Sequence, residues 1–285
     1  IYLNEKLAKY SWFNLGGPAE IFFRPKDKKE LSAFLVYIKD KINNINIMGA
    51  GSNTLVRDGG VKGATIKLGS NFSYVKIHQN NIIEAGAATL DKKVADFAAQ
   101  NSFSGLEFLA CIPGSIGGAI RMNSGCYGNE ISKSLVSFKV IDFKGNLKEV
   151  SKNEINFFYR NTNLPENLII LSAKFKTTNG IKNDIEKKQS QLVELKKKDQ
   201  PSRIKTLGST FKNPLNKKAW QLIKDSNCTN FTVGKAKISD KHCNFLINEG
   251  GVQSLEVEEL IKKIQAQVLK KTGEKLELEI KIIGD

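Results

Sequence analysis

"CIPGSIGGAIRMNSGCYG", residues 111–128, decides how the fold is interpreted, because five of its eighteen positions are glycine. Pro113 stands near its start, and small polar residues such as Ser115 and Asn123 lie between the glycines. A glycine adds no side chain to a core and is kept mainly where the backbone needs a positive φ or where a ligand approaches it closely. The segment therefore predicts either a series of turns or bare backbone against which a ligand lies.

A second glycine-rich stretch, "MGAGSNTLVRDGGVKG" at residues 48–63, follows the strand-like residues 44–47. It is not a Walker A loop, because no Gly-Lys-Ser/Thr follows. A dinucleotide fingerprint would need a third glycine where Thr54 stands, and then a helix. The N–H groups of residues 49–52 can instead form an anion-binding nest, although a glycine-rich turn that binds nothing explains them equally well. Two such segments in one predicted domain favour a large ligand.

The composition is that of an ordinary globular protein, with 40% hydrophobic and 8% aromatic residues in 285 positions. The net charge of +15 suits an anionic partner, so nucleic acid is the first class to consider. The lysines are spread along the chain, however, and the densest runs stand beside glutamates at residues 186–198. A solvated basic surface, with small phosphorylated ligands as partners, is favoured over a nucleic-acid groove.

The four cysteines and two histidines lack metal-site spacing, so we expect free thiols and no metal. No apolar run reaches membrane-spanning length. The chain starts at Ile1 rather than at Met, and we expect a short leader to precede it.

Short apolar runs that end in Gly, Asn or Pro predict strands in the first half of the chain. They lie at residues 19–25, 44–51, 63–69, 74–78 and 81–87. Apolar residues at helical spacing predict helices over residues 28–39 and 91–100. A hairpin with its turn at residues 144–146 follows the glycine-rich segment, and a further strand is predicted at residues 167–176.

The second half begins with a charged helix predicted over residues 181–199. The last helix starts at Ser254, which we expect to cap it, and ends at Gly273. Strict alternation in "LELEIKII" then predicts a strand whose apolar face carries Leu276 and Ile280.

Seven motifs occur in the order seen in one enzyme family, and they cover nearly the whole chain. They are "YSWFNLGGPAEIFFRP", "MGAGSNTLVRDGG", "IPGSIGGAIRMNSGCYG", "FFYRNT", "GSTFKNP", "HCNFLINEGG" and "LELEIKIIG". With them the chain resembles the UDP-N-acetylenolpyruvoylglucosamine reductase (MurB) family in its shorter, type II form. The resemblance implies an α+β protein with a two-subdomain FAD-binding fold of the vanillyl-alcohol oxidase (PCMH) type and a separate α+β substrate-binding domain.

The resemblance also implies boundaries for these parts. The first FAD-binding subdomain is expected at residues 1–70. The second is expected at residues 71–180, joined by the C-terminal strand at 276–285. The substrate-binding domain is expected at residues 181–275.

The family resemblance implies an NADPH-dependent enzyme with non-covalent FAD. Such an enzyme reduces UDP-N-acetylglucosamine enolpyruvate to UDP-N-acetylmuramate for peptidoglycan synthesis. It also implies a cytoplasmic monomer that binds small molecules, with no nucleic acid, membrane or metal. The residues expected at the cofactor are Gly49, Ala50, Gly51, Ser52, Asn53, Leu55, Pro113, Gly114, Ser115, Gly117, Gly118 and Ile120.

Three residues match the family's catalytic positions. Arg160 in "FFYRNT" would stabilise the substrate carboxylate as it gains charge, since its rigid fork suits a carboxylate. Ser209 in "GSTFKNP" would donate the proton, and Glu279 in the terminal strand would orient water or substrate or tune Ser209. Substrate contacts are expected from Tyr159, Lys212 and Asn213.

Some features depart from the family or leave other functions open. Thr229 and Asn230 stand where a Lys-Gly pair is usual, and Lys235 and Lys237 are possible substitutes for that charge. His242 is interpreted as structural. A sugar or alcohol oxidase on the same fold is the main alternative, and a non-catalytic nucleotide-binding protein is the second.

Overall fold

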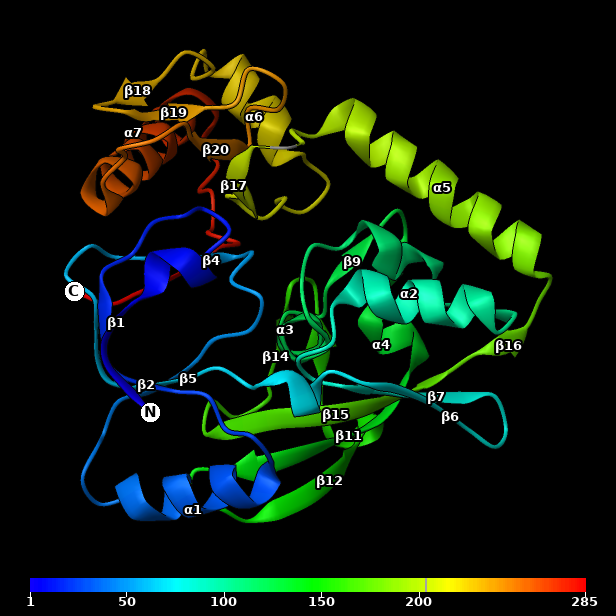
Figure 1. The fold of residues 1–285 in the computed structure, drawn as a ribbon. Helices are drawn as coiled ribbons and strands as arrows, with labels where there is room; N and C mark the ends of the chain where they lie inside the picture. The colour runs from blue at the N-terminus through cyan, green and yellow to red at the C-terminus, as the bar shows by residue number, and fades with distance from the viewer. Residues whose placement is uncertain (203) are drawn as a thin grey trace. The chain divides into compact units, whose positions relative to one another are not determined.

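The computed structural model describes residues 1–202 and 204–285, which fall into two compact units (Figure 1). Unit 1 contains Ile1 and residues 23–50 and 65–196. Unit 2 contains residues 2–22, 51–64 and 197–285. The predicted boundaries at residues 70 and 180 are not those of the compact units, because segments from the first 64 residues belong with the C-terminal part of the chain.

A five-stranded antiparallel sheet lies at the centre of unit 1, in the order β12–β11–β15–β7–β6. Its strands are β6 (Val75–His78), β7 (Ile82–Gly86), β11 (Leu135–Asp142), β12 (Leu147–Ser151) and β15 (Leu168–Lys176). The predicted hairpin is confirmed, and its turn is held by Asp142, whose Oδ1 accepts the N–H groups of Lys144 and Asn146 at 2.8 and 2.9 Å. Gly145 takes φ +88° in this turn.

Helices and short strands complete unit 1, and the predicted helices at 28–39 and 91–100 are confirmed. The helices are α1 (Lys28–Ile38), α2 (Asp91–Gln100), α3 (Ile116–Arg121), α4 (Ile131–Ser134), η2 (Ser70–Phe72), η3 (Glu107–Cys111) and η4 (Lys152–Glu154). The short strands are β3 (Ile45–Ile47), β8 (Phe103–Ser104), β9 (Gly125–Cys126), β10 (Asn129–Glu130), β13 (Phe157–Phe158), β14 (Asn161–Thr162) and β16 (Thr178–Asn179). The charged helix is also confirmed as α5 (Lys182–Asp199).

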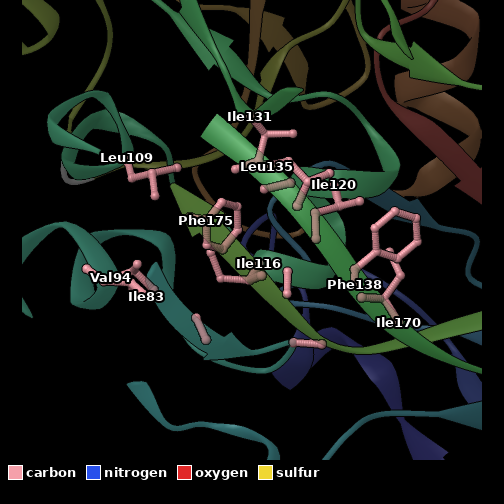
Figure 2. Close-up of a cluster of buried hydrophobic side chains, with 14 of the residues drawn as sticks. Ile83, Val94, Leu109, Ile116, Ile120, Ile131, Leu135, Phe138, Ile170 and Phe175 are labelled. Atoms are coloured by element: carbon pink, nitrogen blue, oxygen red, sulfur yellow. The ribbon is translucent and has the colours of Figure 1, made fainter. Parts of the chain in front are cut away.

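The core of unit 1 lies between one face of the sheet and the helices α2 and α3 (Figure 2). Ile83 of β7 and Phe175 of β15 are completely buried there with Val94 of α2 and Ile116 of α3. Burying each such side chain contributes about 1.5–3 kcal/mol. The core therefore fixes α3, and with it the start of the glycine-rich segment, on the sheet.

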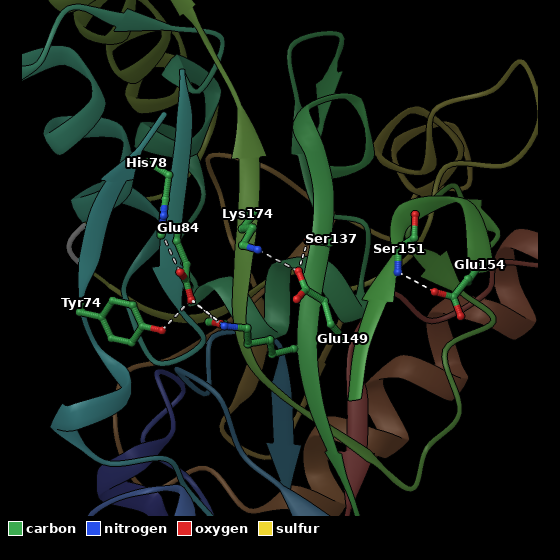
Figure 3. A network of polar contacts seen from close by, with 10 residues as sticks. Tyr74, His78, Glu84, Ser137, Glu149, Ser151, Glu154 and Lys174 are labelled. Atoms are coloured by element: carbon green, nitrogen blue, oxygen red, sulfur yellow. Dashed lines mark hydrogen bonds and ion pairs between the residues drawn. The ribbon is translucent and has the colours of Figure 1, made fainter. Parts of the chain in front are cut away.

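The opposite face of this sheet carries a polar network centred on Glu84 (Figure 3). Its carboxylate accepts hydrogen bonds from Tyr74 at 3.0 Å and Ser172 at 2.9 Å, and it lies 2.9 Å from Nε2 of His78. Burial by itself would raise the pKa of Glu84, but these hydrogen bonds and the charge of Lys139 outweigh it and lower the pKa. The network thus ties together strands β6, β7 and β15.

We expect Glu84→Gln to lower the stability of the protein by about 1–3 kcal/mol at neutral pH, because the buried partners lose a charged acceptor. The folded-state pKa of Glu84 is depressed, so its contribution is present above the unfolded-state pKa of about 4.3 and is lost as the pH falls through the folded-state value. Urea unfolding at pH 7 and at about pH 3 measures this. On acidification, the free energy of unfolding of the wild type should fall toward that of the Glu84→Gln variant. The exposed control Glu259→Gln should lose as much stability as the wild type.

Unit 2 contains two groups of strands and two helices. The N-terminal group has β1 (Tyr2–Lys6), η1 (Leu7–Tyr10), β4 (Thr54–Val56) and most of β2 (Pro18–Phe23) and β5 (Val61–Ile66), whose last residues belong to unit 1. A four-stranded sheet has the order β17–β20–β19–β18, from β17 (Lys205–Ser209), β18 (Thr232–Val233), β19 (Ala236–Ile238) and β20 (Phe245–Asn248). Helices α6 (Ala219–Asp225) and α7 (Ser254–Thr272) complete the unit, and its core includes Phe13, Leu207 and Leu260.

The ends of α7 follow local rules, with one correction to the predicted cap. Gln253, not Ser254, is the N-cap, and it forms a capping box with Glu256. Ser254 is the first helical residue and donates its N–H and Oγ–H to Asp58 at 2.6 and 2.9 Å. The predicted end is confirmed, since Gly273 takes the left-handed conformation with φ +74°.

The C-terminal strand is shorter than predicted, and its partner differs from the predicted one. Only β21 (Lys281–Ile283) is a strand, and it pairs in parallel with β4, whereas the prediction joined residues 276–285 to residues 71–180. The predicted apolar face is confirmed at Leu276 and Ile280, which are 0% and 4% exposed. Alternation predicts which face is buried, but the strand that accepts the pairing is set by tertiary structure.

In the described part of the chain, no helix combines the length and apolar character needed to span a membrane. Nor do the described residues bring three or more His, Cys, Asp or Glu side chains together as a metal site.

Candidate active site

The glycine-rich segment lies in unit 1 from the end of η3 through α3 to β9. Backbone hydrogen bonds from Ile116 N–H to Thr89 O at 3.0 Å and from Gly117 N–H to Ala87 O at 2.9 Å hold the start of α3 against the residues that follow β7. Ser115, the N-cap residue, is 4% exposed. The segment is therefore an ordered surface rather than a loose loop.

Packing inside unit 1 explains three of the five glycines, Gly128 takes a positive φ of +79°, and Gly118 is left open. A Cβ on Gly114 would lie 2.6 Å from Asp91 Oδ2, and one on Gly117 would lie 3.2 Å from Ala87 Cβ. A Cβ on Gly125 would lie 2.2 Å from Asn129 O. Gly118 is exposed, and a Cβ there would have only Ser115 Oγ nearby, at 3.9 Å. Of these glycines, Gly118 is the one whose missing side chain leaves room for a ligand.

The other glycine-rich stretch offers free backbone donors. Among the hydrogen bonds of the described residues, none uses the N–H of Gly49, Ala50, Gly51 or Ser52 as its donor. Consecutive N–H groups without acceptors are the feature of an anion-binding nest. A Cβ on Gly49 would lie 3.0 Å from Ser115 Oγ, so within unit 1 the residue at the start of this stretch lies beside the glycine-rich segment.

Two residues that the sequence analysis did not select also belong to these surroundings in unit 1. The ammonium of Lys67 donates to Gly49 O, and burial together with the charge of Arg24 lowers the pKa of Lys67 to about 8. Asp91 is completely buried, and neither carboxylate oxygen has a hydrogen-bond partner among the described residues. The position of Lys67 near the end of the strand predicted over residues 63–69, which follows the glycine stretch, is the one sequence signal that could have indicated it.

Burial raises the pKa of Asp91 well above its ordinary value. An acid whose pKa is raised on folding costs stability as the pH rises above its unfolded-state value of about 3.9. We therefore expect the wild type to lose stability relative to Asp91→Asn as the pH is raised from about 4 toward neutral. Urea unfolding across this range measures the difference, and the exposed control Asp240→Asn should follow the wild type. Parallel curves for all three proteins would show that Asp91 does not stay protonated.

Arg160 lies in unit 1, and its side chain contacts the glycine-rich segment. It stands in the turn between β13 and β14 with φ +53°, and its Nη2 donates to Gly125 O at 2.7 Å. Its guanidinium carbon lies 5.1 Å from the ring centroid of Tyr159, which is 47% exposed. The turn thus presents an arginine and an aromatic ring beside the segment. The left-handed backbone at Arg160 is uncommon for a residue other than glycine and is typical of functional turns.

Ser209 and Glu279 lie on neighbouring backbone segments of unit 2. Ser209 ends β17, opposite Phe245 of β20 and directly after Gly208, which takes φ +76° at an irregularity in the pairing. The Glu279 N–H donates to Thr210 O at 2.9 Å. The structure therefore brings the backbones of two predicted catalytic residues together from positions seventy residues apart in sequence.

Asn53 connects this pair to the second glycine-rich stretch within unit 2. Its side-chain Nδ2 donates to Glu279 O at 2.9 Å, and its main-chain carbonyl accepts the N–H of Lys281 at 2.9 Å. Asn53 thus holds the segment that carries Glu279 in place.

The remaining predicted site residues have clear structural surroundings. Lys212 lies 3.8 Å from Glu277, and Asn213 accepts the N–H of Ala219 at 2.9 Å, at the start of α6. Leu55 and Ile120 are completely buried in the cores of units 2 and 1, so any contact with a ligand would come from their main chains. Pro113 is half-buried.

His242 and Lys237, which the sequence analysis named without a catalytic role, have structural partners in unit 2. His242 stacks edge-on against Phe245, its Nδ1 accepts the N–H of Asn244 at 3.2 Å, and burial lowers its pKa. Lys237 pairs with Glu249 at 2.8 Å, so its charge already has a partner.

Comparisons with known proteins cover almost the whole chain. The model of the "FAD binding domain" matches residues 19–151, which include both glycine-rich stretches. The model described as "UDP-N-acetylenolpyruvoylglucosamine reductase, C-terminal domain" matches residues 200–283.

Individual relatives extend these matches. UDP-N-acetylenolpyruvoylglucosamine reductase of Pelagibacter ubique (strain HTCC1062) is 46% identical over 280 residues, which cover 97% of this chain and 92% of the relative. The protein of the same name from Rickettsia bellii (strain RML369-C) is 44% identical, with coverage of 98% and 92%. The crystal structure of UDP-N-acetylenolpyruvylglucosamine reductase from Thermus caldophilus is similar with a TM-score of 0.85 at 30% identity, covering 98% of this chain and 97% of that one.

Proposed function

Because the chain belongs to the UDP-N-acetylenolpyruvoylglucosamine reductase (MurB) family and is an oxidoreductase with an FAD-binding domain, we propose that it reduces UDP-N-acetylglucosamine enolpyruvate to UDP-N-acetylmuramate, with NADPH as the reductant. The observation that carries this proposal is the 46% identity to a reductase of this name over 280 residues, which span both matched domains. The product is a precursor of peptidoglycan. We also propose that the enzyme is cytoplasmic and monomeric. Size-exclusion chromatography of the purified enzyme tests the monomeric state.

The residues present fit FAD. The donors at residues 49–52 and the ammonium of Lys67 suit its diphosphate, and the bare surface at Gly118 suits a flat ring system. When bound, FAD would supply hydride transfer between NADPH and the olefinic carbon of the substrate. The chain must then stabilise the negative charge left on the adjacent carbon and its carboxylate, and must supply a proton.

Arg160 is proposed to stabilise that charge. Its guanidinium is permanently positive and can donate two parallel hydrogen bonds to one carboxylate. The hydrogen bond to Gly125 O at 2.7 Å uses Nη2 and holds the side chain against the glycine-rich segment. A donor that is already fixed in place loses little freedom when charge develops, which favours the transition state.

Ser209 is proposed to donate the proton to the carbanionic carbon. A serine hydroxyl is a weak acid, so it serves only where the acceptor is strongly basic and the hydroxyl is held in place. The pairing of Ser209 with Phe245 and the hydrogen bond from Thr210 N–H to Asn244 O at 2.8 Å fix the backbone on both sides of the hydroxyl.

Glu279 is proposed to orient Ser209, water or substrate rather than to accept hydride. Its main chain is held by two hydrogen bonds at 2.9 Å, one from its N–H to Thr210 O and one from Asn53 Nδ2 to its carbonyl oxygen. A carboxylate near developing negative charge is unfavourable when ionised, so its protonated form would suit this place. Tyr159, Lys212 and Asn213 are proposed as substrate contacts.

The visible absorption spectrum of the purified protein tests the proposal. We expect a yellow protein whose flavin absorbance disappears on anaerobic addition of NADPH and returns on addition of the enolpyruvyl substrate. Consumption of oxygen with a sugar or alcohol would instead support the oxidase alternative. A protein that stays colourless with added FAD would contradict the proposal and favour a non-catalytic nucleotide-binding protein.

Gly118→Phe tests the proposed ring surface. Gly118 is exposed and a Cβ there would have only Ser115 Oγ within 4 Å, so the variant should fold but bind FAD at least about tenfold more weakly, since the ring can no longer lie on the backbone. Gly118→Ala is the matched control and should keep the flavin, because its Cβ has 3.9 Å of clearance from Ser115 Oγ. Titration of the FAD-free proteins, followed by flavin fluorescence, measures the affinities. Equal affinities of Gly118→Phe and the wild type would place the ring elsewhere.

A further inference from the structure

The turn that carries Tyr159 and Arg160 has little stability of its own. It joins β13 to β14, and these strands pair over two residues each. An isolated two-stranded hairpin is only marginally stable in water. Two-residue hairpin loops favour a positive φ at their first residue, whereas this turn has its positive φ, +53°, at the second residue, Arg160. The position of Arg160 therefore depends on contacts from outside the hairpin.

Three hydrogen bonds attach the hairpin to the glycine-rich segment, all of them within unit 1. They run from Asn123 Nδ2 to Phe158 O at 3.0 Å, from Thr162 Oγ1 to Arg121 O at 3.1 Å, and from Arg160 Nη2 to Gly125 O at 2.7 Å. The strand β14 accordingly lies beside α3 (Figure 1). The first two bonds hold the hairpin on either side of its turn, and the third is made by Arg160 itself.

Asn123 has a buried side chain that is engaged at both ends. It is 1% exposed, and its Oδ1 accepts the N–H of Ser132 in α4 at 3.2 Å while its Nδ2 donates to Phe158 O. Its φ is +42°, two residues beyond the end of α3. Asparagine is common at a left-handed position after a helix, but glycine serves there as well and has no amide to bury. The amide of Asn123 therefore does more than end the helix, because it connects α4 to the turn of Arg160.

We propose that Asn123 is a positioning residue for Arg160, whose buried amide fixes the turn so that the guanidinium is held ready for the carboxylate of the enolpyruvyl substrate. This inference rests on the proposed function of Arg160. The bond to Gly125 O restrains one nitrogen of the guanidinium, but the side chain is placed only as well as the backbone that carries it. A shift of about 1 Å in a group that acts on the reacting atoms can cost about 10²-fold in rate. Loss of the amide should therefore act on the reaction through Arg160.

A double-mutant cycle of Asn123→Gly with Arg160→Gln tests the proposal, because glycine removes the amide and keeps the left-handed backbone. In single turnovers of Asn123→Gly, reoxidation by the enolpyruvyl substrate should slow at least about tenfold, while bleaching by NADPH stays near the wild-type rate. In the Arg160→Gln background the same change should alter reoxidation less than about twofold, since residues that act as a unit are not additive. The matched control is Asn101→Gly at the exposed end of α2, where Nδ2 donates to Phe97 O, and it should match the wild type.

Asn123→Asp supplies a second measurement that serves even if Asn123→Gly fails to fold. It keeps the shape of the side chain and the acceptor for Ser132. A protonated carboxyl group can donate to Phe158 O, whereas an ionised one has no donor and repels that carbonyl. The ratio of the wild-type to the variant reoxidation rate should therefore rise with pH. An asparagine that only stabilises the fold would lower the free energy of unfolding without this pH profile of the rate.

Hydrogen–deuterium exchange of the purified protein separates this inference from the proposed function. The amides of residues 157–163 should exchange at least about fivefold faster in Asn123→Gly than in the wild type, and those of residues 135–151 should not change. Unchanged exchange at residues 157–163 would overturn the proposal whether or not the enzyme reduces its substrate. Equal slowing of reoxidation with and without Arg160 would also overturn it. A wild type that the substrate does not reoxidise would contradict the proposed function, and with it the role of Arg160, whatever the exchange at the turn.

Discussion

In the Ser209→Ala enzyme we expect NADPH to bleach the flavin at close to the wild-type rate, while reoxidation by the enolpyruvyl substrate slows by about 10²- to 10⁴-fold. This is the usual range for loss of a positioned proton donor. The two half-reactions should differ in this way because only the second one, reoxidation by the substrate, requires a proton to be transferred to a substrate carbon. Gly208 has φ +76° and Ser209 pairs with Phe245, so removing one oxygen should leave this backbone unchanged.

Anaerobic stopped-flow absorbance measures the two half-reactions separately. Ser70→Ala, at an exposed position in η2, is the matched control and should match the wild type in both. An equal loss in the two half-reactions would contradict the role of Ser209, since it would indicate damage to cofactor binding.

Replacement of Arg160 should give the second large effect. Arg160→Gln removes the positive charge, and we expect reoxidation by substrate to slow by about 10²- to 10³-fold, as for loss of one donor to a developing anion. Arg160→Lys keeps the charge but loses the two parallel N–H donors of the guanidinium, so it should recover only part of the rate. Because Arg160 also bonds Gly125 O at 2.7 Å, FAD affinity must be measured alongside the rate.

Single-turnover kinetics with the enolpyruvyl substrate measures this loss, and Lys29→Gln on α1 is an exposed control that removes one positive charge elsewhere in unit 1. If Arg160→Gln weakened FAD binding while reoxidation stayed fast, Arg160 would be a support for the glycine-rich segment and not a group that acts on the substrate.

Much of the local structure is predictable because it depends on residues close in sequence. The helices α1 and α2, the hairpin at Gly145 and the end of α7 at Gly273 all follow from periodicity, turn residues and caps. The prediction of the α7 N-cap is wrong by one residue, since Gln253 rather than Ser254 occupies that position. Ser254, a good capping residue by type, is instead engaged with Asp58, almost two hundred residues away in sequence.

The candidate site could be predicted only as separate motifs. The motifs indicate Arg160, Ser209 and Glu279 as residues, but nothing in their spacing predicts that Glu279 N–H bonds Thr210 O. Asp91 illustrates the limit, because an aspartate at the start of a helix is ordinarily solvated and stabilising. Its burial under Gly114 is a property of the packing and gives no sequence signal.

The sequence by itself determined the longer helices α1, α2, α5 and α7, the hairpin at Gly145, the buried face of the C-terminal segment and the family, since each depends on short motifs or on the period of apolar residues. Only the tertiary structure decided that β21 pairs with β4, and that neighbours occupy the space beside Gly114 and Gly117 while Gly118 is open. The physical reason is that a backbone donor or a missing Cβ has its partner across space, and a distant segment becomes that partner only after the chain has folded.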